Sequence, residues 1–397
     1  MTAGSPRTVL YLHSSAGRYG ADRQLQLLAT GLDPERYRAL VVLPEHGELA
    51  ADLRGAGIDV RVRSLAVMRR ALMSPRGISR VTAAWAADAG GLGRLARAEN
   101  AAVVHTNTSV TLGGAAAARI AAIPHVWHVR EIYAEFERWW PAYRRLLTTA
   151  DALPCVSQAT ADQFEGEPMA TVIHDGLPPM EPRADRAAAR ASLGLDEDVF
   201  VAAVLGRISS WKGQEILARA LADPILAERG AVGLIAGAAW RGEERHERAL
   251  RELGERLGLG ERLRMLGFRD DPEVVYGAAD VVVIPSTQPD PLPNAALEAA
   301  ASGCCVVAAR HGGLPEILRD GETGVLVAPS DAMALAHALG DLAANRARVR
   351  RLGDAARADV RERFAAKRLL DEIQALYDEL IANPPPHRVS ARPRLSA

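Results

Sequence analysis

Hydrophobic and polar positions along this chain predict a first set of buried strands separated by helical segments. An apolar run at residues 8–15 is followed by a glycine turn and then by leucines at helical spacing, the order that opens a parallel α/β domain. Regular alternation of this kind predicts a parallel sheet with helices on both faces. Further strands are expected near residues 38–43, 58–63, 101–107, 124–129, 151–157 and 170–174.

A second set of strands begins after a proline-rich stretch that interrupts the alternation. Its strands are expected at residues 199–206, 232–236, 263–267, 280–285, 304–309 and 324–328, followed by helices at 332–339, 344–361 and 367–381. The predicted fold class is α/β, with two doubly wound parallel-sheet domains that face each other across a cleft. The expected divisions are a domain at 1–178, a linker at 179–195, a domain at 196–366 and a disordered tail at 383–397.

Composition excludes several classes of protein. The chain has 397 residues, 48% of them hydrophobic, and a formal net charge of −1, which argues against nucleic acid as an electrostatic partner. The N-terminal apolar run is too short for a secretory signal, and no uninterrupted apolar stretch approaches membrane-spanning length, so we expect a cytoplasmic protein. The adjacent Cys304 and Cys305 lack metal-ligand spacing and are expected to be reduced core residues.

The stretch at residues 288–303 is the most informative for chemistry. It follows an apolar strand that ends at Pro285, and a helix capped by Asn294 is expected to run to Gly303. Asp290 would then lie in the loop and Glu298 about one turn inside the helix. Two carboxylates beside the free amides of a helix start suit a polyhydroxylated or anionic ligand better than a metal ion.

A second candidate site is the loop that follows the predicted strand 199–206. Arg207 and Lys212 lie there between a strand end and a helix start, where backbone amides also favour an anion, so the loop is a candidate diphosphate site. The loop does not have the P-loop order of glycine, lysine and serine or threonine. Taken alone, two such side chains are more often solvated loop charges.

Together, the motifs of the second half resemble those of glycosyltransferase family 4, the retaining enzymes of the GT-B fold. They are Gly206-Arg207, Lys212-Gly213, the pair Asp290 and Glu298 with seven residues between them, His311-Gly-Gly-Leu-Pro-Glu316 and Asp320-Gly-Glu-Thr-Gly324. The likeness extends to looser motifs around Gly20, Trp127 and Val156 in the first half. It implies that the first domain binds the acceptor, that the second binds a nucleotide sugar, and that the helix at 367–381 returns to the first domain.

The resemblance also implies roles for individual residues. Arg207 and Lys212 would neutralise the nucleoside diphosphate, Glu298 would hold the ribose hydroxyls, and Asp290, where the family has glutamate, would contact the donor sugar. The other donor-binding positions that it implies are Gly20, Phe268, Leu292, Pro293 and Asn294.

In the first half, the resemblance places His128 near the reacting carbon. The catalytic set is thus His128, Asp290, Arg207 and Lys212. The alternative for His128 is a strand-end histidine that hydrogen-bonds to the backbone. Arg130 and Glu131 are either acceptor contacts or an internal ion pair. The aromatic and basic segment 136–145 could bind an acceptor or an anionic membrane surface, although an amphipathic helix with core tryptophans explains it as well.

The predicted function is retaining transfer of a sugar from a UDP- or GDP-linked donor. Fixed cations and helix-start amides can stabilise the departing diphosphate, so we expect neither a metal nor a cofactor. The resemblance implies attack from the leaving-group face. The expected acceptor is a small molecule or a lipid-linked glycan, with peripheral contact to the inner face of the membrane as one option. A non-hydrolysing sugar-nucleotide epimerase and a degenerate nucleotide-binding module remain alternatives.

Overall fold

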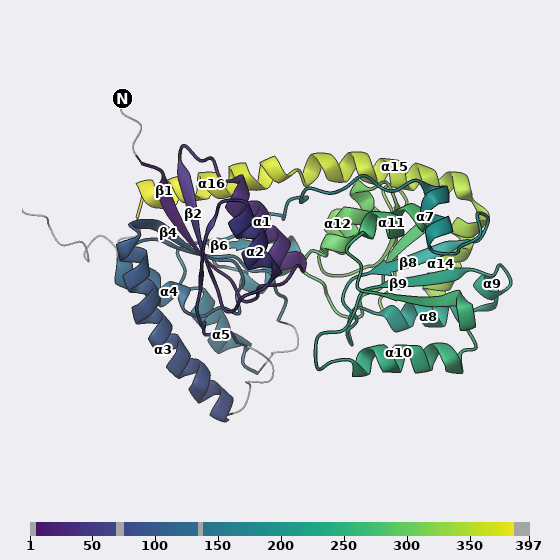
Figure 1. Cartoon of the computed structure of the whole chain (residues 1–397), viewed down its shortest axis with the longest axis horizontal. Helices are drawn as coiled ribbons and strands as arrows, with labels where there is room; N and C mark the ends of the chain where they lie inside the picture. The colour runs from purple at the N-terminus through teal and green to yellow at the C-terminus, as the bar shows by residue number, and fades with distance from the viewer. Residues whose placement is uncertain (1–4, 69–74, 134–137, 385–397) are drawn as a thin grey trace, which may run out of the picture. The chain divides into compact units, whose positions relative to one another are not determined.

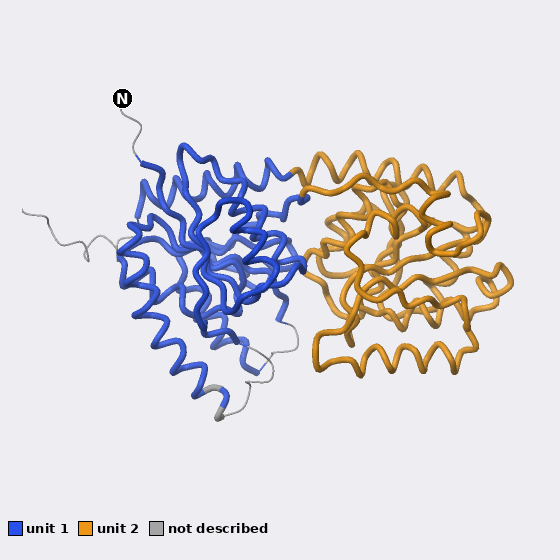
Figure 2. Tube along the Cα trace, in the orientation of Figure 1, with its two compact units in different colours: residues 1–178, 366–397 blue, residues 179–365 orange. Residues whose placement is uncertain are grey.

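The computed structural model describes residues 5–68, 75–133 and 138–384, and it forms two compact units. Unit 1 comprises Met1–Pro178 and Ala366–Ala397, and unit 2 comprises Pro179–Ala365 (Figure 2). Both units are α/β structures built on parallel sheets, which confirms the predicted α/β class with two parallel-sheet domains. Residues 385–397 of the expected disordered tail and residues 136–137 of the aromatic and basic segment lie outside the described residues.

Unit 1 is organised around a five-stranded parallel sheet with the order β3-β2-β1-β4-β5 (Figure 1). Its strands are β1 (Arg7–Leu12), β2 (Tyr37–Leu43), β3 (Asp59–Val62), β4 (Ala101–Thr106) and β5 (His125–Trp127). The chain adds β2 and then β3 on one side of β1, and then adds β4 and β5 on the other side. Ligands of doubly wound sheets bind at the carboxyl ends of the strands beside such a switch in strand order.

Both faces of this sheet are buried, as the nearly continuous apolar strands require. Val9 and Tyr11 of β1 pack in one core cluster with residues of α1, α2 and α16, whereas Leu10 and Leu12 pack in another with residues of α3 and α4. The helices of unit 1 are α1 (Gly20–Gly31), α2 (Glu48–Gly55), α3 (Pro75–Ala98), α4 (Gly114–Ala121), α5 (Trp140–Leu147), α6 (Gln158–Ala161), the 3-10 helix η3 (Asp162–Phe164) and α16 (Ala366–Ala382).

Two strands expected in the main sheet of unit 1 form a small sheet of their own. β6 (Leu153–Cys155) pairs with β7 (Ala170–Val172), and single bridges from Val126 to Ala152 and from Val129 to Cys155 connect this pair to the region of β5. Each of the two strands has three residues.

Unit 2 contains a six-stranded parallel sheet with the order β10-β9-β8-β11-β12-β13 (Figure 1). Its strands are β8 (Val201–Leu205), β9 (Val232–Ala236), β10 (Leu263–Gly267), β11 (Val281–Ile284), β12 (Cys305–Ala309) and β13 (Val325–Val327). The switch in strand order lies between β8 and β11, which pair directly. This is the edge at which the sequence places Arg207, Lys212 and Asp290.

Helices cover both faces of this second sheet. Val281 and Val283 of β11 pack in one core cluster with residues of α8, α14 and α15, while the intervening Val282 is equally buried outside that cluster. The helices are α7 (Arg186–Ser192), α8 (Gln214–Ala222), α9 (Pro224–Ala227), α10 (Arg245–Arg256), the 3-10 helix η4 (Gly260–Arg262), α11 (Pro272–Ala278), α12 (Asn294–Ala301), α13 (Leu314–Ile317), α14 (Ala332–Ala344) and α15 (Arg346–Arg363).

Helix α7 lies inside the stretch that was expected to be a linker. Asp185 caps it by accepting a hydrogen bond from the amide of Ala188 at 3.0 Å, and its Arg190 is buried in unit 2. The proline-rich sequence lies before residue 185, and the capped helix that follows it belongs to unit 2. Among the described helices, none is both long and apolar enough to cross a membrane.

Candidate functional site

The loop between β8 and α8 carries the two predicted diphosphate ligands. Gly213 ends this loop with φ +75°, and a Cβ there would lie 1.9 Å from the carbonyl oxygen of Pro285. Only glycine therefore allows the loop to lie against the end of β11. This contact brings Lys212 close to the loop that carries Asp290.

Lys212 and Asp290 form an ion pair at the switch point of the unit 2 sheet. The distance from Nζ to Oδ2 is 2.6 Å, and Asp290 is only 5% exposed. The hydroxyl of Ser286 approaches the same carboxylate oxygen at 3.5 Å, and the Lys212 ammonium also lies 4.4 Å from the centre of the Trp211 ring. The expected neighbourhood of these two charges is thus present, whereas their direct pairing was not anticipated.

Two glycines fix the shape of the Asp290 loop. The amide of Gly313 donates to the carbonyl of Asp290 at 2.8 Å, and Gly312 adopts φ +58° with its ideal Cβ position 2.2 Å from the same carbonyl. Nε2 of His311 lies 2.8 Å from the carbonyl oxygen of Ser286. The glycines of the His-Gly-Gly motif therefore allow this motif to pack directly against the Asp290 loop, because a side chain at Gly312 would clash with the backbone of Asp290. Leu292, in the same loop, is buried.

Glu298 is presented by helix α12, as the sequence predicted. Pro293 occupies the cap position and Asn294 is the first helical residue, so the expected cap is displaced by one residue. The Glu298 side chain is 8% exposed, and the hydroxyl of Tyr276 donates to its Oε2 at 3.1 Å. A nearly buried carboxylate that accepts one hydrogen bond from a tyrosine hydroxyl can accept further hydrogen bonds from the hydroxyls of a ligand.

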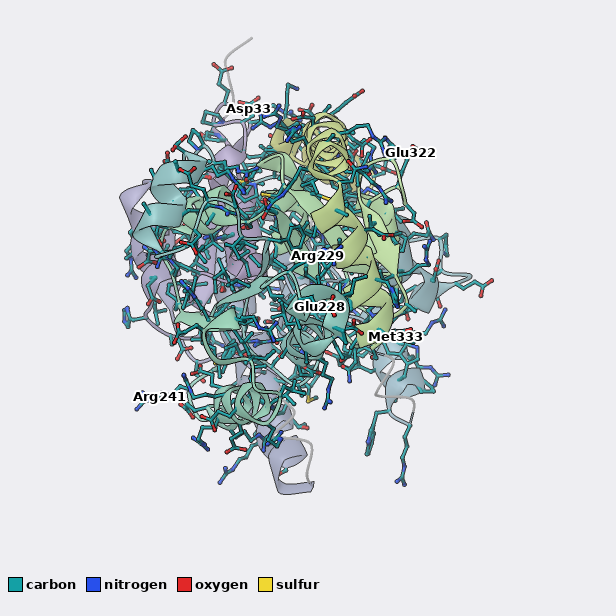
Figure 3. The ribbon with its side chains drawn as sticks, turned by 90° about the vertical axis from the view of Figure 1, so that its right-hand side faces the viewer. Asp33, Glu228, Arg229, Arg241, Glu322 and Met333 are labelled. Atoms are coloured by element: carbon teal, nitrogen blue, oxygen red, sulfur yellow. The ribbon has the colours of Figure 1, made fainter. Side chains whose placement is uncertain are left out.

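Aromatic side chains lie on the neighbouring loops of the same sheet edge. Phe268 follows β10 and is 55% exposed, and Trp240 follows β9 and is 42% exposed. The guanidinium carbon of Arg207 lies 5.2 Å from the centre of the Trp240 ring. Arg241, the next residue, is labelled at the surface in Figure 3. The sequence pattern did not single out Trp240, although it lies in the loop that follows an apolar strand.

His128 directly follows β5 and is completely buried in unit 1. Among the described residues, neither of its ring nitrogens has a hydrogen-bond partner, so the expected alternative of a bond to the backbone is wrong. Burial, reinforced by the charge of Arg130, holds the pKa of His128 well below its ordinary value. The ring is therefore neutral near pH 7, and its proximity to a reacting carbon stays a prediction.

Arg130 and Glu131 do not form the internal ion pair that was one of the two expectations. Arg130 instead pairs with Asp175, 2.6 Å from its Oδ2, while Glu131 accepts hydrogen bonds from the amide and hydroxyl of Ser109. Burial raises the pKa of the Glu131 carboxyl despite these bonds. Both side chains thus have intramolecular partners in unit 1, and an acceptor contact is left untested.

Gly20 begins helix α1, and a histidine–aspartate pair lies beside it at the switch point of unit 1. Nε2 of His13 is 2.9 Å from Asp22, and the side-chain amide of Asn107 approaches Nδ1 of His13 at 3.2 Å. Asp22 also accepts from the amide of Tyr19 at 2.9 Å. Burial favours the protonated acid, but these hydrogen bonds outweigh it and hold the pKa of Asp22 below its ordinary value. No motif in the sequence had singled out this cluster.

The cysteines match their predicted role. Cys155, Cys304 and Cys305 are free and buried, and burial raises the pKa of each thiol. Within the described ranges, no group of three or more His, Cys, Asp or Glu side chains is arranged to hold a metal ion.

Two protein-family models match adjoining parts of the chain. The model described as Glycosyltransferase Family 4 matches residues 19–179, and the one described as Glycosyl transferases group 1 matches residues 185–359. Curated relatives include D-inositol 3-phosphate glycosyltransferases of Nocardia farcinica, 40% identical over 43% of this chain and 38% of that protein, and of Streptomyces bingchenggensis, 36% identical over 55% of this chain and 51% of that protein. The matched regions span about half or less of these relatives' length.

Solved structures resemble nearly the whole chain. HepE of Anabaena, crystallised with UDP and glucose, has a TM-score of 0.80 at 27% identity and covers 94% of this chain and 99% of its own. A glycosyltransferase of Rickettsia africae has a TM-score of 0.79 at 19% identity, and the match covers 96% of this chain and 100% of that one. The latter likeness concerns the fold alone.

Proposed function

The chain belongs to the family 4 glycosyltransferases of the GT-B fold, and from that premise we propose that it transfers a sugar, with retention, from a nucleoside-diphosphate donor bound by unit 2. The observation that carries the proposal is the ion pair of Lys212 and Asp290 beside Arg207, at the switch point of the unit 2 sheet. A sheet edge with two cations and two carboxylates suits a ligand with a diphosphate and several hydroxyls.

Charge development explains what these side chains would do. As the sugar leaves, negative charge grows on the diphosphate and positive charge on the ring carbon. Arg207 and Lys212 would stabilise the first, while Glu298 would hold the ribose hydroxyls and one Asp290 oxygen would remain for a sugar hydroxyl, since Lys212 and Ser286 both contact the other. Fixed charges need no reorganisation during the reaction. This is why we propose transfer that does not depend on a metal.

UDP is the nucleotide to test first for the donor. The support is that HepE, 27% identical to this chain over nearly its whole length, has been crystallised with UDP and with UDP-glucose. GDP is the second choice. For the acceptor, relatives named D-inositol 3-phosphate glycosyltransferases support testing phosphorylated polyols beside lipid-linked glycans.

The segment at residues 138–145 supports a test for membrane contact. Trp139 is 53% exposed at the start of α5, and Arg138 and Arg145 are exposed around it. An aromatic side chain flanked by cations suits an anionic membrane surface. Cosedimentation with anionic and with neutral vesicles would test this contact, and equal pelleting with both would contradict it.

The experiment that tests the function is an NMR time course of UDP-glucose with and without candidate acceptors. Transfer with retention predicts release of UDP that depends on the acceptor, and a product whose anomeric coupling matches that of the donor. Conversion of the sugar nucleotide without an acceptor and without UDP release would instead identify an epimerase. Donor binding without any turnover, with the full acceptor panel present, would favour a degenerate binding module.

A further inference from the structure

Three loops at the carboxyl edge of the unit 2 sheet are joined by backbone hydrogen bonds. The amide of Ile208 donates to Ala238 at 3.1 Å, and that of Gly237 donates to Gly267 at 2.7 Å. Gly237 adopts φ +156°, and a Cβ there would lie 1.9 Å from the carbonyl oxygen of Gly206. Glycine is thus required for the loop after β9 to lie directly against the loop after β8.

This close approach positions Trp240 beside Arg207. The guanidinium lies 5.2 Å from the ring centre, within the range of a cation–π contact, for which tryptophan is the best partner. The ring is 42% exposed, so burial in the core does not explain its position. A second cation–π contact, from the Lys212 ammonium to the Trp211 ring centre at 4.4 Å, involves the other predicted diphosphate ligand.

We propose that Trp240 is a positioning residue of the donor site, whose indole face holds the Arg207 guanidinium ready for the donor diphosphate. An arginine side chain has several rotatable bonds, and ordering it on binding costs free energy. A ring that already restricts the guanidinium removes part of that cost. The inference rests on the proposed function, since it assigns Trp240 to the same diphosphate site.

The competing role for Trp240 is direct stacking on the nucleotide base. Phe268, on the adjoining loop, is 55% exposed and is one of the donor-binding positions that the family resemblance implies. The two roles predict different dependence on the phosphates and on Arg207. Acting through Arg207, Trp240 affects any diphosphate and has no effect once the guanidinium is gone.

The test is a double-mutant cycle of Trp240→Leu and Arg207→Gln, measured by isothermal titration with UDP, inorganic pyrophosphate and uridine. Trp240→Leu should weaken UDP and pyrophosphate about two- to fivefold, the range of an exposed cation–π contact, and leave uridine unchanged. In the Arg207→Gln background it should change nothing. Trp240→Phe should retain most of the affinity, and Trp85→Leu, at a tryptophan 38% exposed in unit 1, should behave as wild type.

The proposal is overturned if Trp240→Leu binds UDP and pyrophosphate as wild type does. It is also overturned if the loss persists in the Arg207→Gln background, which would show that Trp240 acts without Arg207, or extends to uridine, which would assign Trp240 to the nucleoside. Wild-type protein that binds neither UDP nor pyrophosphate would reject the donor site itself, and the inference with it. A melting temperature of Trp240→Leu close to that of wild type, together with the Trp240→Phe result, separates loss of positioning from misfolding.

Discussion

At the scale of single residues, two buried histidines make the stability of unit 1 depend on pH. His105 and His128 are fully buried, and burial followed by the charge of Arg130 holds both pKa values well below the ordinary value. In the unfolded chain each would titrate near pH 6.5. Below that pH the unfolded state binds protons that the folded state does not, so stability is fully present above about pH 6.5 and is lost as the pH falls.

We therefore expect the unfolding free energy to decrease between pH 7.5 and pH 5.5, by about 1.4 kcal/mol per pH unit for each histidine once the pH is well below 6.5. Calorimetry across this range measures the slope. His128→Phe should reduce this slope by the contribution of about one bound proton. His46→Gln, at an exposed histidine, should leave the slope unchanged. A stability that does not change with pH in this window would contradict the buried neutral state of these rings.

Residue-level prediction from the sequence worked where a simple rule applies. Lys212 and Asp290 are 78 positions apart, yet both follow strands of one parallel sheet, so the strand-end rule brings them to one edge. No such rule predicts the pairing of Arg130 with Asp175, because Asp175 lies 45 positions from Arg130 and follows no strand of the main sheet. Cation–π contacts such as that of Trp240 depend on loop conformation, which hydrophobic periodicity does not encode.

At the scale of secondary-structure elements, Asp280 connects three parts of unit 2. Its carboxylate accepts from the buried Arg190 of α7 at 2.9 Å and from the amide of Val201 at the start of β8 at 2.8 Å. Arg186 and Arg346 pair with the other oxygen. Helices α7 and α15 are therefore attached to the beginning of β11 by one side chain.

Asp280→Asn should destabilise unit 2 by about 3–5 kcal/mol, because it leaves the Arg190 charge buried without a counter-ion. Asp354→Asn is the matched control. It removes a carboxylate from an exposed pair with Arg357 at 3.2 Å, which should contribute less than about 1 kcal/mol. Urea unfolding of both variants measures the difference, and equal stability of the two would show that Asp280 has no such role.

Strands with apolar runs were predictable, whereas a short capped helix and the pairing of two short strands were not. The central strands β8, β9 and β11 agree with their expected ranges to within a few residues, because burial on both faces requires continuous apolar sequence. Helix α7 was not expected within residues 179–195, and β6 and β7 lie in their expected ranges but form a separate sheet. Their positions depend on a cap and on single bridges, which leave little trace in a pattern of hydrophobic positions.

At the scale of the whole molecule, unit 1 is discontinuous in sequence and depends on helix α16. Leu369, Ile373 and Tyr377 of this helix are completely buried in the unit 1 core. The hydroxyl of Tyr377 lies 2.6 Å from Nδ1 of His105 and 3.0 Å from the hydroxyl of Tyr11. The return of the last helix was predicted only through the family resemblance, because nothing in its periodicity indicates which unit it joins.

Tyr377→Phe should destabilise unit 1 by about 1–3 kcal/mol, because two buried polar groups lose their shared partner. Tyr19→Phe, at a tyrosine 38% exposed, removes the same atom at the surface and should change stability by less than about 0.5 kcal/mol. Chemical denaturation followed by hydrogen exchange in β1 and β4 would measure the effect on unit 1. Wild-type stability of Tyr377→Phe would contradict the polar attachment of α16.

The most direct test of the account is the affinity of the whole protein for UDP, measured by isothermal titration in the presence of EDTA. Lys212→Met should weaken binding about tenfold or more, the size of a lost hydrogen bond to a charged group. Lys367→Met is its control, since Lys367 is the only other lysine and its side chain is 84% exposed. Binding by wild type and Lys367→Met, with loss in Lys212→Met, supports a metal-independent donor site in unit 2. Equal affinity of all three proteins, or binding only when a divalent metal is restored, would contradict it.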